Sequence, residues 1–233
     1  MVSLSHVLAA TVIRVWLSTS SQSWRRLPRP RGEPVVNAPG PNPDRILVVG
    51  SGAVVGYGVL SHDLSVNGQL ARLVAATTGR GVDLRILADP DLDVRAARRE
   101  LEKVRLDGFD VIVVTVGSLD ALQLLPRREW GAQLGLLLDS IRARAGRELR
   151  ILVMGIPPLT ALVPIPRPFR TAVRKRCDAL NSESAHQIAS RPGVAFVPFT
   201  PPEIDLMQNA SREVHTVWAR IIAPSVVGAL QQG

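Results

Sequence analysis

The stretch that decides the fold is residues 45–58, which read Arg-Ile-Leu-Val-Val-Gly-Ser-Gly-Ala-Val-Val-Gly-Tyr-Gly. Its apolar part, Ile46–Val49, predicts a buried β-strand. Glycines follow at positions 50, 52, 56 and 58, and closely spaced glycines after a strand are typical of the working edge of an α/β sheet. The stretch is therefore either a glycine-rich phosphate-binding turn or a turn that presents a nucleophile.

Four more apolar runs follow this first strand, at 84–87, 111–116, 151–154 and 194–197. The segments between them have one apolar face at helical spacing, which predicts helices near 69–77, 94–104, 130–141, 170–188 and 211–230. Strands that alternate with helices form a mainly parallel sheet that is covered on both faces. We therefore predict an α/β fold of three layers, α/β/α, whose ligand site lies beyond the carboxyl ends of the five strands.

The chain before the first strand divides into two segments. Residues 1–26 contain an apolar stretch, Val7–Leu17, which is too short for a transmembrane helix and lacks the basic start of a signal peptide. Residues 27–43 are rich in proline and predict an extended linker, so the domain proper covers 44–233. The N-terminal helix either lies on a membrane surface through residues 1–31, which end in several arginines, or packs on the domain or a partner.

Composition excludes several functions. The formal net charge is +8, but aromatic residues make up only 4% of the chain and do not interleave with basic ones, so we expect no nucleic-acid partner. Cys177 is the only cysteine and the four histidines are scattered, so neither a disulfide nor a metal site is predicted, and we expect no cofactor. These features favour a cytoplasmic location, with peripheral membrane contact as an option. A basic run within 167–176 predicts either an anion-binding surface or a solvated helix face.

The five loops after the strands together resemble the SGNH/GDSL hydrolase superfamily, and its actinobacterial branch in particular. The resemblance covers about residues 44–230. It implies a flavodoxin-like sheet of five parallel strands, and serine-esterase or acyl-transfer chemistry. The motifs that carry it are Gly50, Gly56-Tyr57-Gly58, Ser61-His62-Asp63, Val116-Gly117, Asp120-Ala121, Gly155-Ile156-Pro157-Pro158 and Trp218-Ala219.

The resemblance places Gly52 at the nucleophile position. The family carries Gly-Asp-Ser there, with the serine as nucleophile, whereas this chain reads Gly50-Ser51-Gly52. Glycine has no oxygen with which to attack an ester. Ser51 lies one position early, and a shift of one residue along a strand turns a side chain to the other face.

Both oxyanion positions also depart from the family pattern. The family's glycine in the second block corresponds to Asp91, whose carboxylate would repel an oxyanion unless it is an ordinary loop residue. The family's asparagine in the third block corresponds to Leu119, which cannot donate a hydrogen bond. Ser118 could replace it or could satisfy backbone groups of the turn.

The last family block, Asp-x-x-His, corresponds to Leu206 and Asn209, so the general base is also missing. A shifted pair of Asp205 and His215 is the alternative. We expect His215 instead on the helix surface or under the N-terminal segment, and a local hydrogen-bonding role for His62.

The sequence thus predicts a member of the hydrolase superfamily with a non-catalytic binding or regulatory role, and an acyl or lipid-like small molecule is a candidate partner. Its candidate pocket residues are Ser51, Gly52, Ser118, Asp120 and Asn209. The first alternative is a divergent esterase, lipase or acyltransferase with a rebuilt site, Ser51 with His215 being the fallback catalytic pair.

The second alternative is dinucleotide binding through Gly50-x-Gly52-x-x-x-Gly56, which requires a helix to open directly after the last glycine. The sequence indicates no oligomeric state.

Overall fold

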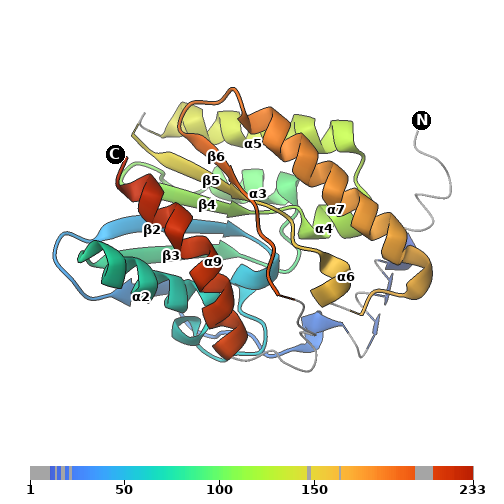
Figure 1. Cartoon of the computed structure of the whole chain (residues 1–233), viewed down its shortest axis with the longest axis horizontal. Coiled ribbons are helices and arrows are strands. Elements are labelled where there is room, and N and C mark those ends of the chain that lie inside the picture. The colour runs from blue at the N-terminus through green and yellow to red at the C-terminus, as the bar shows by residue number, and fades with distance from the viewer. Residues whose placement is uncertain are drawn as a thin grey trace.

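A six-stranded sheet forms the centre of the protein (Figure 1). The structure is a computed structural model and describes residues 11–13, 15–16, 19–20, 23–145, 148–162, 164–202 and 212–232. The strands lie in the order β1-β3-β2-β4-β5-β6. Their bounds are β1 Val35–Ala38, β2 Asp44–Gly50, β3 Val82–Ala88, β4 Val111–Thr115, β5 Arg150–Met154 and β6 Val194–Val197. Strands β2 to β6 are parallel, and β1 pairs antiparallel with β3.

Helices cover both faces of this sheet, which gives the three predicted layers (Figure 1). On one face α2 packs against α9, and on the other α5 packs between α3 and α7. The bounds are α2 Val66–Thr78, α3 Val94–Leu101, α5 Arg127–Arg144, α7 Arg167–Ile188 and α9 Arg212–Leu230. Shorter helical turns are η1 Trp24–Arg26, η2 Gly52–Val55, η3 His62–Leu64, α4 Ser118–Leu122 and α6 Leu159–Leu162.

All five predicted strands are present and parallel, but the predicted strand count was wrong because β1 is a sixth strand. It lies in the segment expected to be a linker. Val36 and Ala38 are buried while Val35 and Asn37 are exposed, so β1 has one apolar face. Prolines are tolerated beside a strand only at a sheet edge, and β1 occupies the edge next to β3.

The first helix begins earlier than predicted. The expected start was near Gln69, whereas α2 starts at Val66 because Ser65 caps it. The Ser65 Oγ accepts a hydrogen bond from the Asn67 N–H at 3.2 Å, which satisfies one of the free donors at the helix start. The helix ends at Gly79, which has a left-handed φ of 71°.

Part of the N-terminal segment packs on the domain. Ile13 is buried, whereas Val12 and Val15 are about half exposed at 50% and 55%. The Gly58 N–H donates to the Pro28 carbonyl at 2.8 Å, so residues near 28 lie against the loop after β2. Within the described ranges, no helix combines the length and the apolar character needed to cross a membrane. Contact of residues 1–31 with a membrane surface stays a prediction, since most of the apolar stretch lies outside the described residues.

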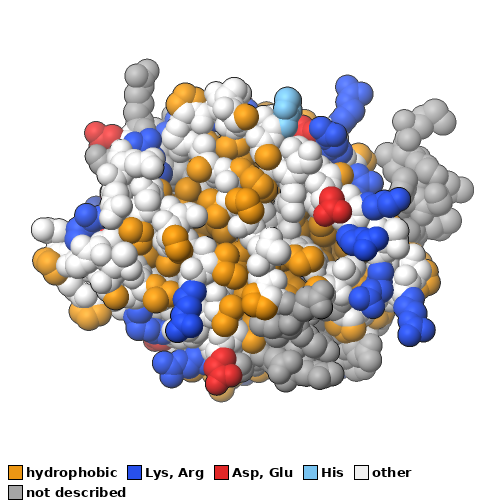
Figure 2. All heavy atoms as spheres, in the orientation of Figure 1, with side chains coloured by type: hydrophobic (Ala, Val, Ile, Leu, Met, Phe, Trp, Pro, Cys, Tyr) orange, Lys and Arg blue, Asp and Glu red, His pale blue; other side chains and the backbone are white. Residues whose placement is uncertain are grey.

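The basic run on α7 forms an exposed face. Arg167, Arg170, Arg174 and Lys175 are all exposed, and Figure 2 shows Lys and Arg side chains gathered over this end of α7. In the part of the chain that the structure describes, none of these four side chains forms an ion pair. Both interpretations of this run, a solvated helix face and an anion-binding surface, therefore stay predictions.

Candidate functional site

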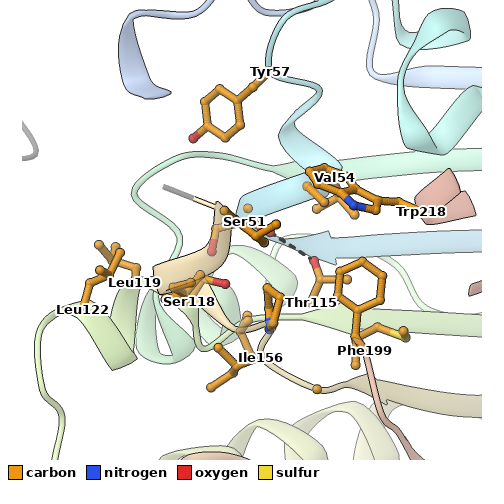
Figure 3. A pocket seen from close by; sticks show the side chains of 18 of the residues that line it. Ser51, Val54, Tyr57, Thr115, Ser118, Leu119, Leu122, Ile156, Phe199 and Trp218 are labelled. Carbon is orange, nitrogen blue, oxygen red and sulfur yellow. Dashed lines mark hydrogen bonds between the residues drawn. The ribbon is translucent and has the colours of Figure 1, made fainter. Parts of the chain in front are cut away.

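A pocket opens at the carboxyl ends of β2, β4 and β5, where the topology of a parallel sheet places ligand sites. It encloses about 910 Å³ including its open mouth. Its walls come from the turn after β2, from α4 and α6, and from α9. Figure 3 shows Ser51 and Ser118 in the middle, Leu119 and Leu122 to one side, and Phe199 and Trp218 to the other.

The turn after β2 places Ser51 and Gly52 in the pocket wall. The Ser51 N–H donates to the Thr115 carbonyl at 3.2 Å, and the Thr115 hydroxyl donates to the Val49 carbonyl at 3.2 Å. These bonds hold the end of β2 against β4. Ser51 is 4% exposed, and its Oγ has no hydrogen-bond partner among the described residues.

Ser51, one of the candidate pocket residues, lines the pocket, although strand alternation had predicted that its side chain turns to the face opposite that of residue 52. The expectation assumed that the strand continues, but β2 ends at Gly50, which has a φ of 146°. The chain then turns into η2, so the alternation of a strand no longer applies.

Gly52 lies beside open space in the pocket. Its φ is 74°, in the region that favours glycine. A Cβ added there would lie 3.5 Å from the Ser118 Oγ, which is an ordinary contact distance. The position is therefore limited by its backbone conformation and not by lack of room.

Two of the three candidate residues on α4 line the pocket. Leu119 is 7% exposed and contributes an apolar wall. Ser118 also lines the pocket, and the hydrogen bonds to turn backbone expected of its hydroxyl are absent among the described residues.

Asp120 was wrongly predicted as a pocket residue. Its side chain faces the start of α3, where Oδ1 accepts from the Val94 N–H at 3.4 Å. Oδ2 has no partner among the described residues. Burial, reinforced by the nearby Asp93 carboxylate, raises the pKa of Asp120 to about 7. The reason for the error is the short helix α4, which carries side chains 118 and 119 into the pocket and side chain 120 away from it.

His215 is buried, so of its two expected places, the helix surface and a position under the N-terminal segment, the first was wrong. It is 1% exposed, and its Nε2 lies 3.0 Å from the Tyr57 carbonyl oxygen. Burial lowers the pKa of this imidazole. The ring packs edge-on against Trp218, with 5.7 Å between the ring centroids. The packing of α9 on the body of the protein buries this residue. Sequence periodicity does not reveal such packing.

The fallback pair of Ser51 and His215 is not assembled. The Ser51 Oγ has no hydrogen-bond partner among the described residues, so the imidazole is not within hydrogen-bond reach of it. None of the described histidines lines the pocket. His62 lies on η3, and partial burial lowers the pKa of its imidazole.

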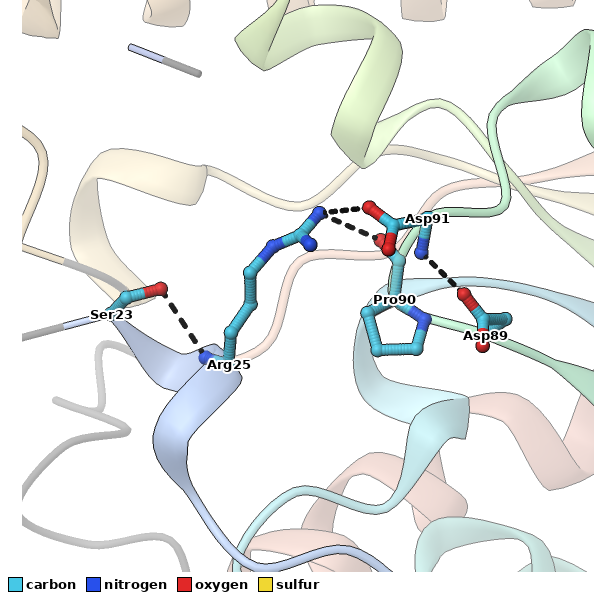
Figure 4. A network of polar contacts seen from close by, with 5 residues as sticks. All are labelled: Ser23, Arg25, Asp89, Pro90 and Asp91. Atoms are coloured by element: carbon cyan, nitrogen blue, oxygen red, sulfur yellow. Dashed lines mark hydrogen bonds and ion pairs between the residues drawn. The ribbon is translucent and has the colours of Figure 1, made fainter. Parts of the chain in front are cut away.

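Asp91 does not itself line the pocket, and Figure 4 shows its side chain paired with Arg25. Its side chain is 71% exposed and pairs with Arg25, whose Nη2 lies 2.5 Å from Oδ1. The same Nη2 donates to the Pro90 carbonyl at 3.4 Å, and Pro90 does line the pocket. Asp91 is therefore a loop residue that ties the N-terminal segment to the pocket rim.

The remaining predicted residues fall outside what the structure describes. Leu206, Asn209 and Asp205 lie in 203–211, which is not among the described residues. Their assignment to the family's Asp-x-x-His block stays a prediction, as does the assignment of Gly52 to the nucleophile position.

The described residues hold neither a metal cluster nor a phosphate-binding helix. No group of three or more His, Cys, Asp or Glu side chains within the described ranges is placed to hold a metal ion. Cys177 is buried, and burial raises the pKa of its thiol to about 12. The dinucleotide interpretation needs a helix directly after Gly56, but the next α-helix, α2, starts at Val66. The geometry of the turn therefore does not favour that interpretation.

Solved structures that share this fold include esterases and lipases. An extracellular lipase from Streptomyces rimosus is 18% identical, with a TM-score of 0.55, covering 81% of this chain and 99% of that one. The lipase Lip_vut3 from a goat rumen metagenome is 15% identical, with a TM-score of 0.61, covering 80% and 99%. A family two carbohydrate esterase from Clostridium thermocellum is 13% identical, with a TM-score of 0.59, covering 83% of this chain and 66% of that one.

These low identities establish a shared fold only. The chain matches no curated protein sequence. Residues 48–221, well over half of the chain, match the model of the GDSL-like lipase/acylhydrolase family. This match, together with the parallel sheet and the pocket at its carboxyl edge, shows that the protein belongs to the GDSL-like lipase/acylhydrolase family, within the SGNH/GDSL hydrolases.

Proposed function

We propose that this family member binds an acyl or lipid-like small molecule without hydrolysing it. The observation that carries the proposal is the make-up of the pocket. Ser51 and Ser118 line it, yet no described imidazole reaches either hydroxyl. A serine becomes a nucleophile only when an adjacent base takes its proton.

The predicted position of Gly52 supports the loss of catalysis. If Gly52 occupies the nucleophile position, the residue beside the open pocket has no oxygen at all. If Leu119 occupies the family's asparagine position, it offers an apolar side chain where the family donates to the oxyanion, and the loss of one such donor costs about a hundredfold to a thousandfold in rate. A site that lacks both the nucleophile and this donor has lost two contributions at once.

The pocket walls support an apolar ligand. Leu119, Leu122, Ile156 and Phe199 present hydrocarbon surface to the pocket. Pockets with mostly apolar walls and a few polar groups are typical of small-molecule sites. An acyl chain would bury apolar surface against these walls.

A direct test combines ester hydrolysis with covalent labelling. The purified full chain would be incubated with p-nitrophenyl esters of short and medium chain length, and separately with a fluorophosphonate probe. We expect no turnover above a heat-denatured control and no labelled serine. Turnover or labelling that disappears in Ser51→Ala or Ser118→Ala would overturn the proposal in favour of the rebuilt-site alternative.

A gain-of-function variant tests the assignment of the positions. The double variant Gly52→Ser with Asn209→His restores two of the departures from the family pattern, the nucleophile and the general base, and the space beside Gly52 accommodates the new side chain. We expect measurable ester hydrolysis only in the double variant. Each single variant is the matched control, since a serine without a base, or a base without a serine, stays inactive.

A further inference from the structure

Every described residue that lines the pocket is uncharged at neutral pH. The lining contains no Asp, Glu, Lys, Arg or His side chain within the described ranges. Its polar side chains are all neutral: Ser51, Tyr57, Thr115, Ser118 and Trp218. An ionised head group that entered the pocket would lose its water without gaining a counter-charge, which is strongly unfavourable.

Two of these neutral side chains are buried with an unused polar atom. The Ser51 Oγ and the Trp218 Nε1 have no hydrogen-bond partner among the described residues, and the two residues are 4% and 3% exposed. The Thr115 hydroxyl differs, because it donates to the Val49 carbonyl at 3.2 Å. Buried polar atoms without partners are rare in folded proteins, and each calls for a physical reason.

Both unused atoms are held on rigid elements. The Trp218 indole packs edge-on against Phe199, with 6.4 Å between the centroids, and against His215. Ser51 is held by its backbone hydrogen bond to Thr115. Both residues are almost completely buried, so a partner reaches these atoms through the pocket that they line.

We propose that the missing partner is the uncharged polar head of a neutral, chain-like ligand, a deepening that rests on the binding function proposed above. The indole N–H only donates, so the head must carry an acceptor oxygen. The Ser51 hydroxyl donates to the same oxygen or bonds to a neighbouring one. A ketone, an ester or a fatty alcohol meets these conditions, whereas the carboxylate of a free fatty acid does not because the pocket offers it no cation.

The test compares ligands of equal chain length that differ in the head. Binding of 2-decanone, decanoate and decane to the full chain would be measured by competition against a fluorescent apolar probe, at about pH 8, where decanoate is ionised. We expect 2-decanone to bind at least about tenfold more tightly than decanoate, a difference of about 1.4 kcal/mol. Equal or tighter binding of decanoate would overturn the inference about the head group.

Variants identify the atoms that recognise the head. Trp218→Phe removes the indole N–H and keeps an aromatic ring. We expect it to weaken 2-decanone binding about threefold to tenfold more than it weakens decane binding, the usual contribution of one hydrogen bond. Ser51→Ala should act in the same direction and serves as an independent variant if Trp218→Phe folds poorly. Equal losses for ketone and decane would indicate packing alone and would overturn the assignment of these donors.

Trp130→Phe is the matched control for the loss of an indole. Trp130 is also buried, but its Nε1 donates to the Ser184 Oγ at 3.0 Å and the residue does not line the pocket. We expect Trp130→Phe to leave all three affinities unchanged. If none of the three ligands binds the wild-type chain, the proposed binding function fails with the inference. If all three bind equally, the binding function stands and only the selection of a neutral head fails.

Discussion

Two buried tryptophans differ in whether their indole N–H is hydrogen-bonded, one at the contact between α5 and α7 and the other in the pocket beyond β2 and β4. Between the helices, the Trp130 Nε1 donates to the Ser184 Oγ at 3.0 Å, and Ser184 in turn donates to the Leu180 carbonyl at 2.9 Å. In the pocket wall, the Trp218 Nε1 has no partner among the described residues. One tryptophan belongs to a completed network and the other presents an unused donor.

The buried acidic side chains of the same two regions differ in the same way, because the one on α7 is well hydrogen-bonded and the one on α4 is not. Glu183 on α7 accepts hydrogen bonds from Gln187 and Arg127, and these contacts lower its pKa. Asp120 on α4, behind the pocket wall, has one long bond to Val94 and an unused Oδ2, and burial raises its pKa to about 7.

The difference is a local one: the buried indole between α5 and α7 is paired, the buried Ser51 Oγ and Trp218 Nε1 in the pocket wall are not, and other unpaired atoms, such as the Nε atoms of Arg98 and Arg150, occur elsewhere among the described residues. The unused atoms of Ser51, Trp218 and Asp120 lie in or beside the pocket. Departures from the general rule that buried polar groups are paired are expected at functional sites.

The largest effect expected from this comparison is that of Asp120→Asn on the pH dependence of stability. The pKa of Asp120 is about 7 in the folded state, against an ordinary value of 3.8. Between these values the folded protein keeps a proton that the unfolded chain has released, so stability falls as the pH rises through this window. The full cost is about 4 kcal/mol above pH 7. Asparagine cannot ionise and keeps the Oδ1 that accepts from Val94. The stability of the variant relative to the wild type should therefore increase as the pH rises.

Urea unfolding of the wild type and Asp120→Asn at several pH values measures this gain, and parallel curves for the two proteins would contradict it. Glu183→Gln is the control with the opposite sign. A lowered pKa stabilises the fold above the unfolded value and loses this contribution as the pH falls, so Glu183→Gln should cost stability near neutral pH and less in acid.

The next largest effect is the difference in stability between alanine substitutions of the two glycines that flank Ser51. A Cβ on Gly50 would lie 2.4 Å from the Thr115 Oγ1 and 2.6 Å from its carbonyl oxygen, whereas a Cβ on Gly52 has room. Gly50→Ala should therefore cost about 3 kcal/mol of unfolding free energy, through overpacking and an unfavourable φ. Gly52→Ala should cost about 1 kcal/mol, from its φ alone. Chemical denaturation measures both, and equal costs would show that the pocket is closed beside Gly52.

A smaller effect distinguishes the two tryptophans by stability. Trp130→Phe removes the donor to Ser184 and should cost about 2 kcal/mol. Trp218→Phe removes a donor that is buried without a partner, so the relief of that penalty offsets part of the lost packing and the net change should stay below about 1 kcal/mol. Thermal unfolding monitored by circular dichroism gives both values, and the reverse order would indicate that the Trp218 indole is satisfied.

The smallest effect concerns the attachment of the N-terminal segment to the pocket rim. Asp91 of the Arg25–Asp91 ion pair is 71% exposed, so Arg25→Ala should cost less than about 1 kcal/mol. Because the same guanidinium contacts the Pro90 carbonyl, we expect faster ligand exchange than in the wild type. Stopped-flow release of the fluorescent probe measures this rate, and Arg26→Ala, with a more exposed side chain, is the control.

The sequence by itself determined the layered α/β fold and its family. The five parallel strands are predictable because strands buried on both faces appear as continuous apolar runs, as in Val111–Thr115. The glycines after the first strand indicated the working edge because closely spaced glycines after a strand are a local sequence pattern of such edges. The departures at Gly52 and Leu119 from the family pattern also come from the sequence alone.

Only the tertiary structure decided which side chains face the pocket. Burial of His215, the turn of Asp120 towards α3 and the entry of Ser51 into the pocket wall depend on how α9, α4 and the end of β2 pack against distant parts of the chain. Strand β1 was missed for a related reason, since four residues between prolines become a strand only when the edge of β3 supplies their hydrogen bonds. Local pattern sets the type of an element, whereas the surroundings of a side chain come from contacts between residues far apart in sequence, which periodicity does not record.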